Sequence, residues 1–501
     1  MGRHTCATIV ALAILCVVCG RAAASPGTIK FGVADDTGKY AADSGAEFYA
    51  RIAASGLGND RLTVMWDPAN PTTITEQPFL DRTIPEAASI GVNLILSVRP
   101  ERANAIGGSL VQAKRFAAFV ALLATTYPTV KTFVIANEPN QPRFWQPQFR
   151  NGKPVAGHDY ERVLALCYDA LKKVDPTITV VGGALSGRGN DDAQALSNRS
   201  TSPLRFLYDL GVAYRASKRK APLMDLFAFH PYPRSSLDSL KKGLEWPMAG
   251  YANLDRVKQG LWDAFNGTGQ PTTETGLGIM IDEIGWQVRV ASSAPDSPYV
   301  GVENVPVTTE AKQATIYGQL VRSAECDPTL KDLFFLPFID ETSLTGFQSG
   351  LLRADGSERP SFTTVTNAIA ATGGRCIGRR VVWKHARTVL GAQVFFHGLA
   401  IPKVASRQRA WGFAVRTAED ARYVATVVPV SGSKRTTADV PTAPAAKMRT
   451  VGYAKANWTP LVRFPKRHLP PGRYAYHLVL QAAFNPARKR VVVSRTFVVR
   501  P

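Results

Sequence analysis

The sequence predicts an α/β protein in which a (β/α)8 TIM barrel is followed by a C-terminal all-β sandwich of immunoglobulin-like type. Three observations lead to this fold class. Eight short apolar runs alternate with segments of helical periodicity between residues 29 and 371. The first run continues as FGVADDTGKY, which lacks the glycine-rich turn of an open, doubly wound sheet. From about residue 377 onward the helical pattern stops and only short β-rich runs remain.

The eight apolar runs are the expected strands of the barrel, at residues 29–34, 61–66, 93–98, 131–136, 178–183, 225–230, 279–283 and 333–338. The helices between them are inferred from apolar residues spaced three and four positions apart. One such face consists of Phe116, Phe119, Val120 and Leu123. Another runs from Val163 to Val174 and is expected to end before Asp175-Pro176, because proline disfavours helical backbone in the residue before it.

The first 24 residues have the features of a secretory signal peptide. A polar start is followed by an apolar run at residues 7–18, too short to span a bilayer comfortably, and then by small residues suited to cleavage. We therefore expect a secreted protein with three parts: a signal peptide at residues 1–24, the barrel at residues 25–372 and a basic β-domain at residues 373–501. An uncleaved membrane anchor is the alternative interpretation of the apolar run.

Three cysteines lie beyond the expected signal peptide: Cys167, Cys326 and Cys376. Export implies an oxidising compartment, in which Cys326 and Cys376 are the pair expected to form a disulfide. Cys167 lies on the apolar face of its helix and is expected to be an inert core thiol. The spacings resemble no zinc or iron–sulfur motif, and we expect neither a metal nor a cofactor.

Charge is distributed unevenly along the chain. The protein has 60 Lys and Arg against 39 Asp and Glu, a formal net charge of +21. Residues 373–501 hold 24 of the basic and 3 of the acidic side chains, so the basic β-domain accounts for the whole excess. No nucleic-acid partner is expected, because no recognition motif accompanies this charge. Two interpretations stay open: the domain binds an anionic polymer or a cell-wall surface, or its arginines reflect composition without a specific partner.

Two glutamates follow apolar strands that face each other across the expected barrel. Glu138 comes after the fourth strand, in VIANEPN, and Glu283 ends the seventh, in GIMIDEIGWQ. An ionised carboxylate at the end of a buried strand is costly unless it is paired or used. Glycoside hydrolysis needs such a pair, with the pKa of the acid held up by its environment and the nucleophile kept ionised. The alternative is a pair of structural salt bridges to Arg61 or Arg99.

The barrel segment resembles the clan A glycoside hydrolases of the family 39 or family 5 type, across nearly all of residues 29–371. The resemblance is carried by ANEPN with Phe144-Trp145 after it, by FAFHPY, by DEIGWQ and by GLLRADGSERPSF. It implies that Glu138 is the acid/base and Glu283 the nucleophile.

The same resemblance implies supporting roles for four neighbours. Asn137 would bond the sugar 2-hydroxyl, Tyr232 would orient Glu283, and His230 would line the −1 subsite. Arg61 would support the nucleophile, with a buried structural ion pair as the alternative.

The sequence departs from that clan in two places. Members usually carry a tryptophan at the end of the eighth strand as the floor beneath the −1 sugar, where this chain reads FFLPFIDE. Phe338, Trp286 or Trp145 is expected to take its place. Asp282 precedes Glu283 where a small hydroxyl residue is common, and strand alternation is expected to point Asp282 away from the barrel axis.

The sequence thus predicts a secreted, retaining O-glycoside hydrolase that acts on an oligo- or polysaccharide with two glutamates. The alternative is a non-catalytic carbohydrate-binding or cell-surface adhesion protein on a glycosidase-like barrel. A carbohydrate is the expected ligand in both cases.

Overall fold

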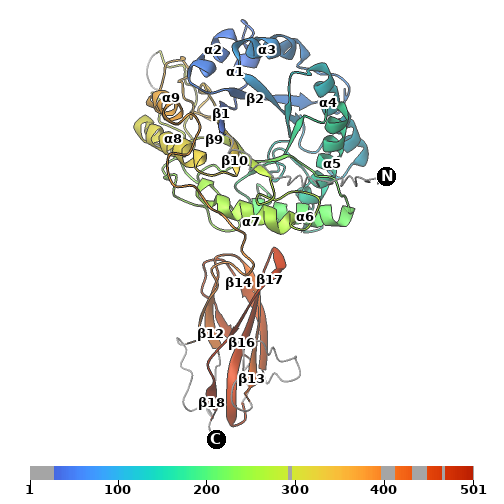
Figure 1. Ribbon diagram of the computed structural model, residues 1–501, viewed down its shortest axis with the longest axis vertical. Coiled ribbons are helices and arrows are strands. Elements are labelled where there is room, and N and C mark those ends of the chain that lie inside the picture. Colours follow the sequence, from blue (N-terminus) through green and yellow to red (C-terminus); the bar gives the residue numbers. More distant parts are fainter. Residues whose placement is uncertain (1–27, 292–295, 397–411, 431–447, 465–468, 500–501) are drawn as a thin grey trace, which may run out of the picture.

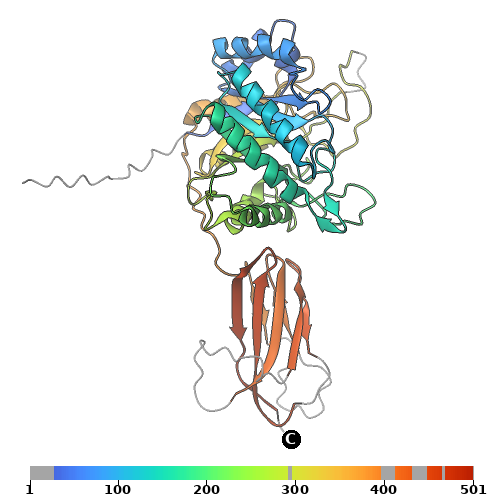
Figure 2. The same cartoon turned by 90° about the vertical axis from the view of Figure 1, so that its right-hand side faces the viewer.

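The computed structural model describes residues 28–291, 296–396, 412–430, 448–464 and 469–499. The expected signal peptide lies outside these residues. The described chain forms a barrel and a smaller, elongated β-domain beside it (Figures 1 and 2). None of the helices within it is both long and apolar enough to cross a bilayer.

Eight parallel strands close into a barrel in the order β1-β10-β9-β8-β7-β4-β3-β2. Their bounds are β1 (Lys30–Val33), β2 (Asn59–Trp66), β3 (Asn93–Pro100), β4 (Thr132–Ile135), β7 (Thr179–Ser186), β8 (Leu226–His230), β9 (Gly278–Ile284) and β10 (Leu330–Phe335). Each overlaps one expected strand, so the prediction of a (β/α)8 barrel is confirmed. A two-stranded hairpin of β5 (Phe149–Arg150) and β6 (Lys153–Pro154) lies outside the barrel sheet.

Helices surround the barrel (Figure 1). They are α1 (Thr37–Tyr40), α2 (Ala46–Ala54), α3 (Gln77–Ile90), α4 (Leu110–Thr126), α5 (Ala156–Val174), α6 (Pro203–Ser217), α7 (Leu254–Phe265), α8 (Glu310–Glu325) and α9 (Pro360–Thr372), with a short 3-10 turn at Tyr251–Asn253. The apolar face expected around Phe116 lies on α4 and is buried. As predicted, α5 ends directly before Asp175-Pro176, and Cys167 is a buried free thiol.

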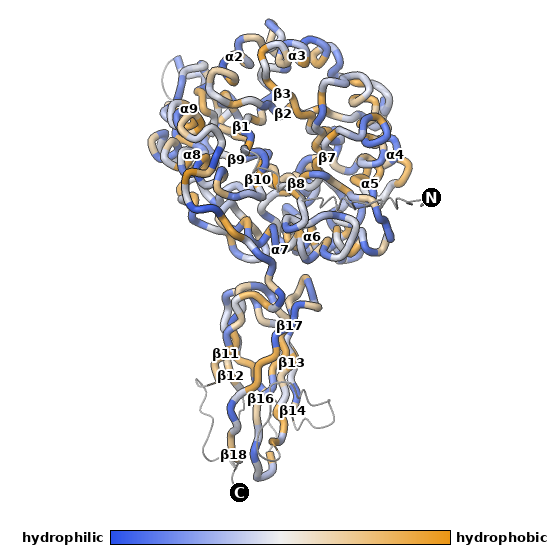
Figure 3. Tube along the Cα trace, in the orientation of Figure 1, coloured by the Kyte–Doolittle hydropathy of each residue, from blue (hydrophilic) through white to orange (hydrophobic). Residues whose placement is uncertain are grey.

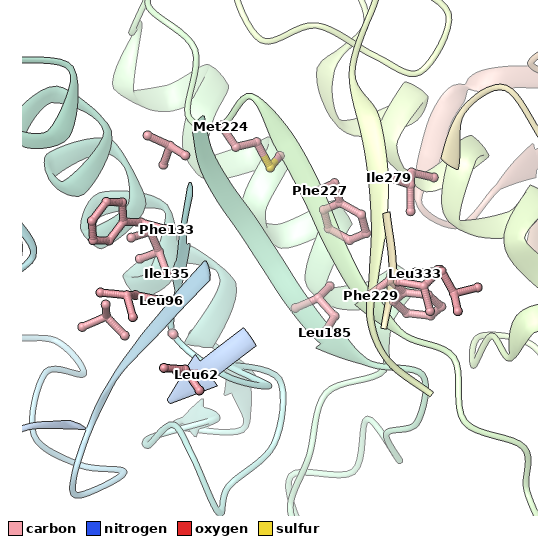
Figure 4. Packing of buried hydrophobic residues seen from close by; sticks show 14 of the residues in the cluster. Leu62, Leu96, Phe133, Ile135, Leu185, Met224, Phe227, Phe229, Ile279 and Leu333 are labelled. Carbon is pink, nitrogen blue, oxygen red and sulfur yellow. The ribbon is translucent and has the colours of Figure 1, made fainter. Parts of the chain in front are cut away.

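Buried apolar side chains form two layers on the barrel sheet. Leu62, Leu96, Phe133 and Phe227 belong to the large cluster between strands and helices (Figure 4). Because successive side chains of a strand face opposite sides, alternate positions fill the barrel interior. That inner cluster consists of Ala34, Ile95, Val134, Val181, Ala184, Ala228, Met280 and Phe334. The interior is thus packed, and a ligand must bind at the strand ends.

The eighth strand differs in position from its prediction. β10 runs from Leu330 to Phe335, three residues before the expected range of 333–338. The first residues of β10 include Lys331 and Asp332, whose polar side chains do not fit the pattern of a buried strand. Asp332 is nevertheless buried, and burial raises its pKa to about 6. Phe338 therefore belongs to the loop after β10.

The basic β-domain consists of two antiparallel sheets around one core, which includes Phe413, Val415, Tyr476 and Leu478. One sheet contains β11 (Gln393–Phe395), β12 (Gly412–Arg416) and β15 (Leu461–Arg463). The other contains β14 (Met448–Ala454), β13 (Ala421–Pro429), β16 (Gly472–Ala482), β17 (Asn485–Val493) and β18 (Phe497–Val499). Hydrophobic residues recur along β16 and along the barrel strands β2 and β3 (Figure 3). The antiparallel, all-β prediction is confirmed, while immunoglobulin-like connectivity and the domain boundaries stay predictions.

The basic β-domain contacts the barrel through a buried ion cluster. Arg488 of β17 donates to Asp263 of α7 at 2.9 Å and to Glu419 of its own domain at 2.6 Å. All three side chains are less than a tenth exposed. Beside them, Phe484 stacks on Tyr208 of α6. Buried charge and ring packing together fix the domain against α6 and α7 (Figure 1).

A disulfide joins Cys326, at the end of α8, to Cys376, in the segment between the barrel and the basic β-domain. The predicted pairing is thus confirmed. The bond ties the end of the barrel to the start of the connection.

Candidate active site

A cavity of about 860 Å³ opens where the carboxyl ends of the barrel strands meet. Five of the predicted site residues line it, namely Arg61, Asn137, Glu138, Tyr232 and Glu283. They come from β2, β9 and the loops after β4 and β8, so the closed barrel brings together side chains from distant parts of the chain.

The backbone after β4 adopts an unusual conformation that places Glu138 at the cavity. The φ angle is +67° at Ala136 and +38° at Glu138, values that residues with side chains rarely adopt. Two backbone bonds hold this turn: Ala136 N–H donates to Val98 C=O at 2.8 Å, and Glu138 N–H donates to Ala184 C=O at 2.9 Å. Strain of this kind persists where the surrounding structure enforces it, as at functional sites.

Glu283 is held by donors from other strands. Arg61 Nη2 donates to Glu283 Oε1 at 2.5 Å, and the Tyr232 hydroxyl donates to Oε2 at 3.1 Å. Arg61 Nη2 also donates to Asn137 Oδ1 at 3.2 Å. Burial raises the pKa of Glu283 above its usual value, against the opposing charges of His230 and Arg61. A raised pKa was expected of the acid and not of the nucleophile, but the donors Arg61 and Tyr232 favour the carboxylate form of Glu283.

His230, at the end of β8, bridges the two glutamates. Its Nδ1 lies 3.1 Å from Glu138 Oε1 and 3.3 Å from Glu283 Oε2, while Nε2 lies 3.0 Å from Asp282 Oδ1. Burial alone would lower the pKa of His230, but Asp282 and Glu283 outweigh it and raise the pKa well above its usual value. With a carboxylate oxygen within 3.3 Å of each ring nitrogen, the protonated form of His230 is favoured.

The position of His230 corrects one expectation. The side chain is fully buried and is not part of the cavity lining. It lies behind the glutamates and supports them, whereas the family resemblance implied that it would line the −1 subsite.

Asp282 points into the barrel, although it was expected to face outward because its neighbour Glu283 faces the cavity. Met280 belongs to the interior cluster, and Asp282, two residues later, faces the same side. Asp282 is fully buried and pairs with His230 and, at 3.4 Å, with Arg61 Nε. Burial opposes its ionisation, yet His230 and then Arg61 lower the pKa of Asp282 below its usual value. A register shift between β9 and β10 near their ends lets both Asp282 and Glu283 reach the site.

Phe338 does not lie beneath a sugar. It is fully buried and packs edge-on against Phe48 of α2, with ring centroids 5.6 Å apart. Its backbone N–H donates to Asp35 Oδ2 at 2.9 Å. The expectation was wrong because β10 ends at Phe335, and the loop after it turns Phe338 toward the helices.

The two tryptophans proposed as substitutes are also absent from the cavity lining. Trp145 is buried and packs edge-on against Tyr160 of α5. Trp286 is buried, and its Nε1 donates to the backbone carbonyl of Asp238 at 3.0 Å. Both expectations were wrong, because each indole is buried by contacts with neighbouring elements and offers no face to the cavity.

Two phenylalanines contribute aromatic surface to the cavity, which Tyr40 and Tyr232 also line. Phe347, in the loop after β10, lines the cavity, is 37% exposed and stacks on Tyr232 with ring planes at 24°. Phe144 lines it as well, with the guanidinium groups of Arg99 and Arg143 over its ring. Phe347 lies in a loop without periodicity. The sequence could have indicated its role only through the need for an aromatic residue near the eighth strand.

In the parts of the chain that the structure describes, no group of three or more His, Cys, Asp or Glu side chains is arranged to hold a metal ion. The carboxylates beside β1 have structural partners. Asp35 Oδ1 accepts from Thr37, and Asp36 pairs with Lys39 at 3.3 Å.

Comparison with solved structures finds similarity to glycoside hydrolases. A family 39 glycoside hydrolase from Bacteroides cellulosilyticus WH2 is 14% identical, over 88% of this chain and 81% of that chain, with a TM-score of 0.48. A monomeric β-xylosidase from Caulobacter crescentus CB15 is 13% identical, over 91% and 96%, with a TM-score of 0.46. GH5_18 from Streptomyces cattleya, in complex with GlcNAc, is 15% identical, over 73% and 84%, with a TM-score of 0.46. No family model and no curated protein matches the chain. Similarity at these identities and TM-scores does not assign an activity to this chain. We infer the activity from the side chains of the cavity instead.

Proposed function

We propose that this protein is a retaining O-glycoside hydrolase with Glu138 as acid/base and Glu283 as nucleophile. One observation carries the proposal: the two glutamates, from β4 and β9, both reach the Nδ1 atom of His230 at one cavity. Since one oxygen of each lies 3.1 and 3.3 Å from that nitrogen, these oxygens are at most 6.4 Å apart, the sum of the two distances. Retaining pairs have carboxyl groups roughly 5–5.5 Å apart and inverting pairs about 6.5–9.5 Å, and the bound on these two oxygens is compatible with retention.

In the first step, Glu283 attacks the anomeric carbon as a carboxylate. The bond from that carbon to the leaving-group oxygen breaks, the oxygen takes the proton of Glu138, and a glycosyl ester forms on Glu283. Arg61 and Tyr232, both bonded to Glu283, favour its ionised form against the effect of burial and fix its orientation before attack.

In the second step, a water attacks the anomeric carbon of the ester. Glu138, now a carboxylate, takes a proton from the water, and the bond to Glu283 breaks to release the sugar with its original configuration. Negative charge thus moves from Glu283 to Glu138 and back. The imidazolium of His230 faces both carboxylates, so it stabilises whichever of them carries the charge.

Asn137 and Phe347 are the proposed sugar contacts. Arg61 occupies Asn137 Oδ1, which leaves the amide nitrogen of Asn137 as the group that donates to a sugar hydroxyl. The half-open face of Phe347, stacked on Tyr232, offers an apolar surface to the pyranose ring, the role expected of Phe338 from the sequence.

Secretion and retention on an anionic polymer or cell-wall surface belong to the same proposal. Secretion is supported by the signal-peptide pattern of residues 1–24. Retention is supported by exposure: among the described Lys and Arg beyond residue 373, Arg488 alone is buried and the others are exposed.

The test is a screen of aryl glycosides and polysaccharides with Glu138→Gln, Glu283→Gln and the parent protein. We expect each variant to lose turnover by about 10²- to 10⁴-fold, because each removes one acid–base or nucleophilic group, while saccharide binding persists. Glu341→Gln is the matched control, since Glu341 is an exposed carboxylate of the same cavity outside the glutamate pair. The configuration of the first product, read by NMR, should be that of the substrate.

Unchanged turnover in either glutamate variant, or a first product of inverted configuration, would overturn the proposal. A parent protein that binds saccharides but hydrolyses none of them would establish the non-catalytic alternative.

A further inference from the structure

Charge is distributed asymmetrically around the cavity. Arginines line it from the loops after β4, β7 and β8, which are neighbours in the closed barrel, at Arg143, Arg188 and Arg234. Carboxylates line it from the residues after β1 and β10, which are neighbours elsewhere in the barrel, at Asp35, Asp36 and Glu341. Glu138 follows β4, so the proposed acid/base lies on the arginine-rich side.

The carboxylates after β1 are already compensated. Asp35 Oδ2 accepts the backbone N–H groups of Phe338 and Ile339 at 2.9 and 3.0 Å. Asp36 pairs with Lys39, which in turn pairs with Glu76 at 2.9 Å. The carboxylates after β1 therefore make little demand for a cationic ligand.

Arg188 is not compensated in this way. No carboxylate among the described residues forms an ion pair with it, whereas its neighbour Arg234 pairs with Glu245. Arg188 Nη2 donates to the backbone carbonyls of Pro233 and Arg234, the latter at 3.2 Å. Gln141 Nε2 donates to the backbone carbonyl of Arg188 at 2.6 Å. Backbone and guanidinium are thus both held in place at the cavity, with the remaining donors of the guanidinium available to a ligand.

We propose that Arg188 binds a carboxylate or sulfate group of an acidic saccharide, on the leaving-group side of the scissile bond. This rests on the proposed function, because the acid role of Glu138 defines that side. A planar guanidinium fits a carboxylate or sulfate through paired N–H donors, and a pre-positioned one loses little conformational freedom on binding.

Two further observations support an anionic ligand. Arg188 is exposed at the cavity with Arg234 as its neighbour, so positive charge there is accessible to an anion. The exposed charge of the basic β-domain has the sign that would attract the same class of polymer toward the barrel.

The test measures binding by calorimetry, with the full-length protein carrying Glu283→Gln in every arm so that no turnover intervenes. The probes are matched pairs: β-1,4-glucuronic acid oligomers against cello-oligosaccharides, and sulfated against desulfated chondroitin oligosaccharides. We expect the anionic member of at least one pair to bind more tightly than its neutral or less charged partner. Arg188→Gln should weaken that binding by about tenfold to a hundredfold, and Arg188→Lys by less.

Arg199→Gln is the matched control. Arg199 is an exposed arginine of the same loop, its Nε donates to the backbone carbonyl of Ala195, and it lies outside the cavity lining. Arg199→Gln removes the same charge as Arg188→Gln. If Arg188 acts through local contacts, Arg199→Gln should change the affinity for the anionic probe by about twofold or less.

Equal affinity for both members of every pair, no binding to any anionic probe, or equal losses in Arg188→Gln and Arg199→Gln would each overturn the inference. Failure of the proposed function looks different: the parent protein would hydrolyse no glycoside although Arg188-dependent binding is present. Hydrolysis of glycosides by the parent protein together with any of those three binding results would leave the function standing and remove the inference.

Discussion

The barrel region and the basic β-domain use charge in opposite ways. Residues 1–372 contain 36 basic and 36 acidic side chains, yet Arg61, His230, Asp282 and Glu283 meet in one buried network at the cavity. The basic β-domain has an excess of 21 positive charges, but among its described Lys and Arg side chains only Arg488 is buried. The net charge of a region therefore points to a surface suited to anions, whereas buried and paired charges point to the candidate active site.

Arg488 is where the two regions meet, and its loss should have the largest effect on stability. Arg488→Ala leaves Asp263 and Glu419 buried without their cation, which costs about 3–5 kcal/mol. We expect the basic β-domain to detach from α7, with a lower calorimetric transition and faster proteolysis between the two regions. Glycoside turnover by the cavity should persist at temperatures below that transition.

Lys489→Ala is the control for Arg488→Ala, because Lys489 is the next residue and is exposed. If both variants melt alike, the ion cluster does not hold the regions together. If Arg488→Ala also abolishes turnover in the folded protein, the separation of roles between barrel and β-domain is wrong.

The buried network should respond to pH in a way that the exposed charges do not. The pKa of His230 is raised, so its stabilising contribution is complete below about pH 6.5 and is lost as the pH rises through the raised value. The pKa of Asp282 is lowered, so its contribution is complete above about pH 3.9 and is lost as the pH falls through the lowered value. Asp282→Asn should therefore destabilise most between about pH 4 and 6.5, by about 1.5–3 kcal/mol.

Urea unfolding at about pH 5.5 and about pH 9 checks this dependence. Glu274→Gln is the comparison, since it removes a partly exposed carboxylate that lies 2.8 Å from His385, a residue of the segment that follows the barrel. A surface pair contributes about 0–1 kcal/mol, so its loss should change stability little at either pH. An Asp282→Asn effect that is larger at about pH 9 than at about pH 5.5 would contradict a charged His230.

The smallest expected effect concerns the aromatic wall of the cavity. Phe347→Ala removes the apolar face beside Tyr232 and should raise KM by about tenfold, or about 1.4 kcal/mol, with a smaller change in kcat. Phe338→Leu is the matched variant: it should lower the melting temperature and leave KM unchanged, because Phe338 is buried against α2. If Phe338→Leu raised KM and Phe347→Ala did not, Phe338 and not Phe347 would be the residue that contacts the sugar.

Features that depend on strand periodicity could be predicted from the sequence, whereas features that depend on where a strand ends could not. Apolar runs located all eight barrel strands, and position after a strand brought Glu138 and Glu283 to one cavity. The register shift between β9 and β10 has no local sequence signal, so Asp282 was placed on the wrong side.

Loop conformation was the second source of error. Trp145, Trp286 and Phe338 looked suited to a sugar because they are large and aromatic, but burial against neighbouring elements decides their role. Phe347 occupies the wall of the cavity from a loop of ordinary composition, where no periodic pattern could identify it.

Identification of a covalent intermediate tests the pairing of Glu138 and Glu283 most directly. The protein is incubated with an activated 2-deoxy-2-fluoro glycoside of whichever sugar it hydrolyses, digested, and examined by mass spectrometry. We predict a fluorosugar adduct on the peptide that contains Glu283, absent from Glu283→Gln. An adduct on another residue, or no adduct together with a first product of inverted configuration, would contradict the account.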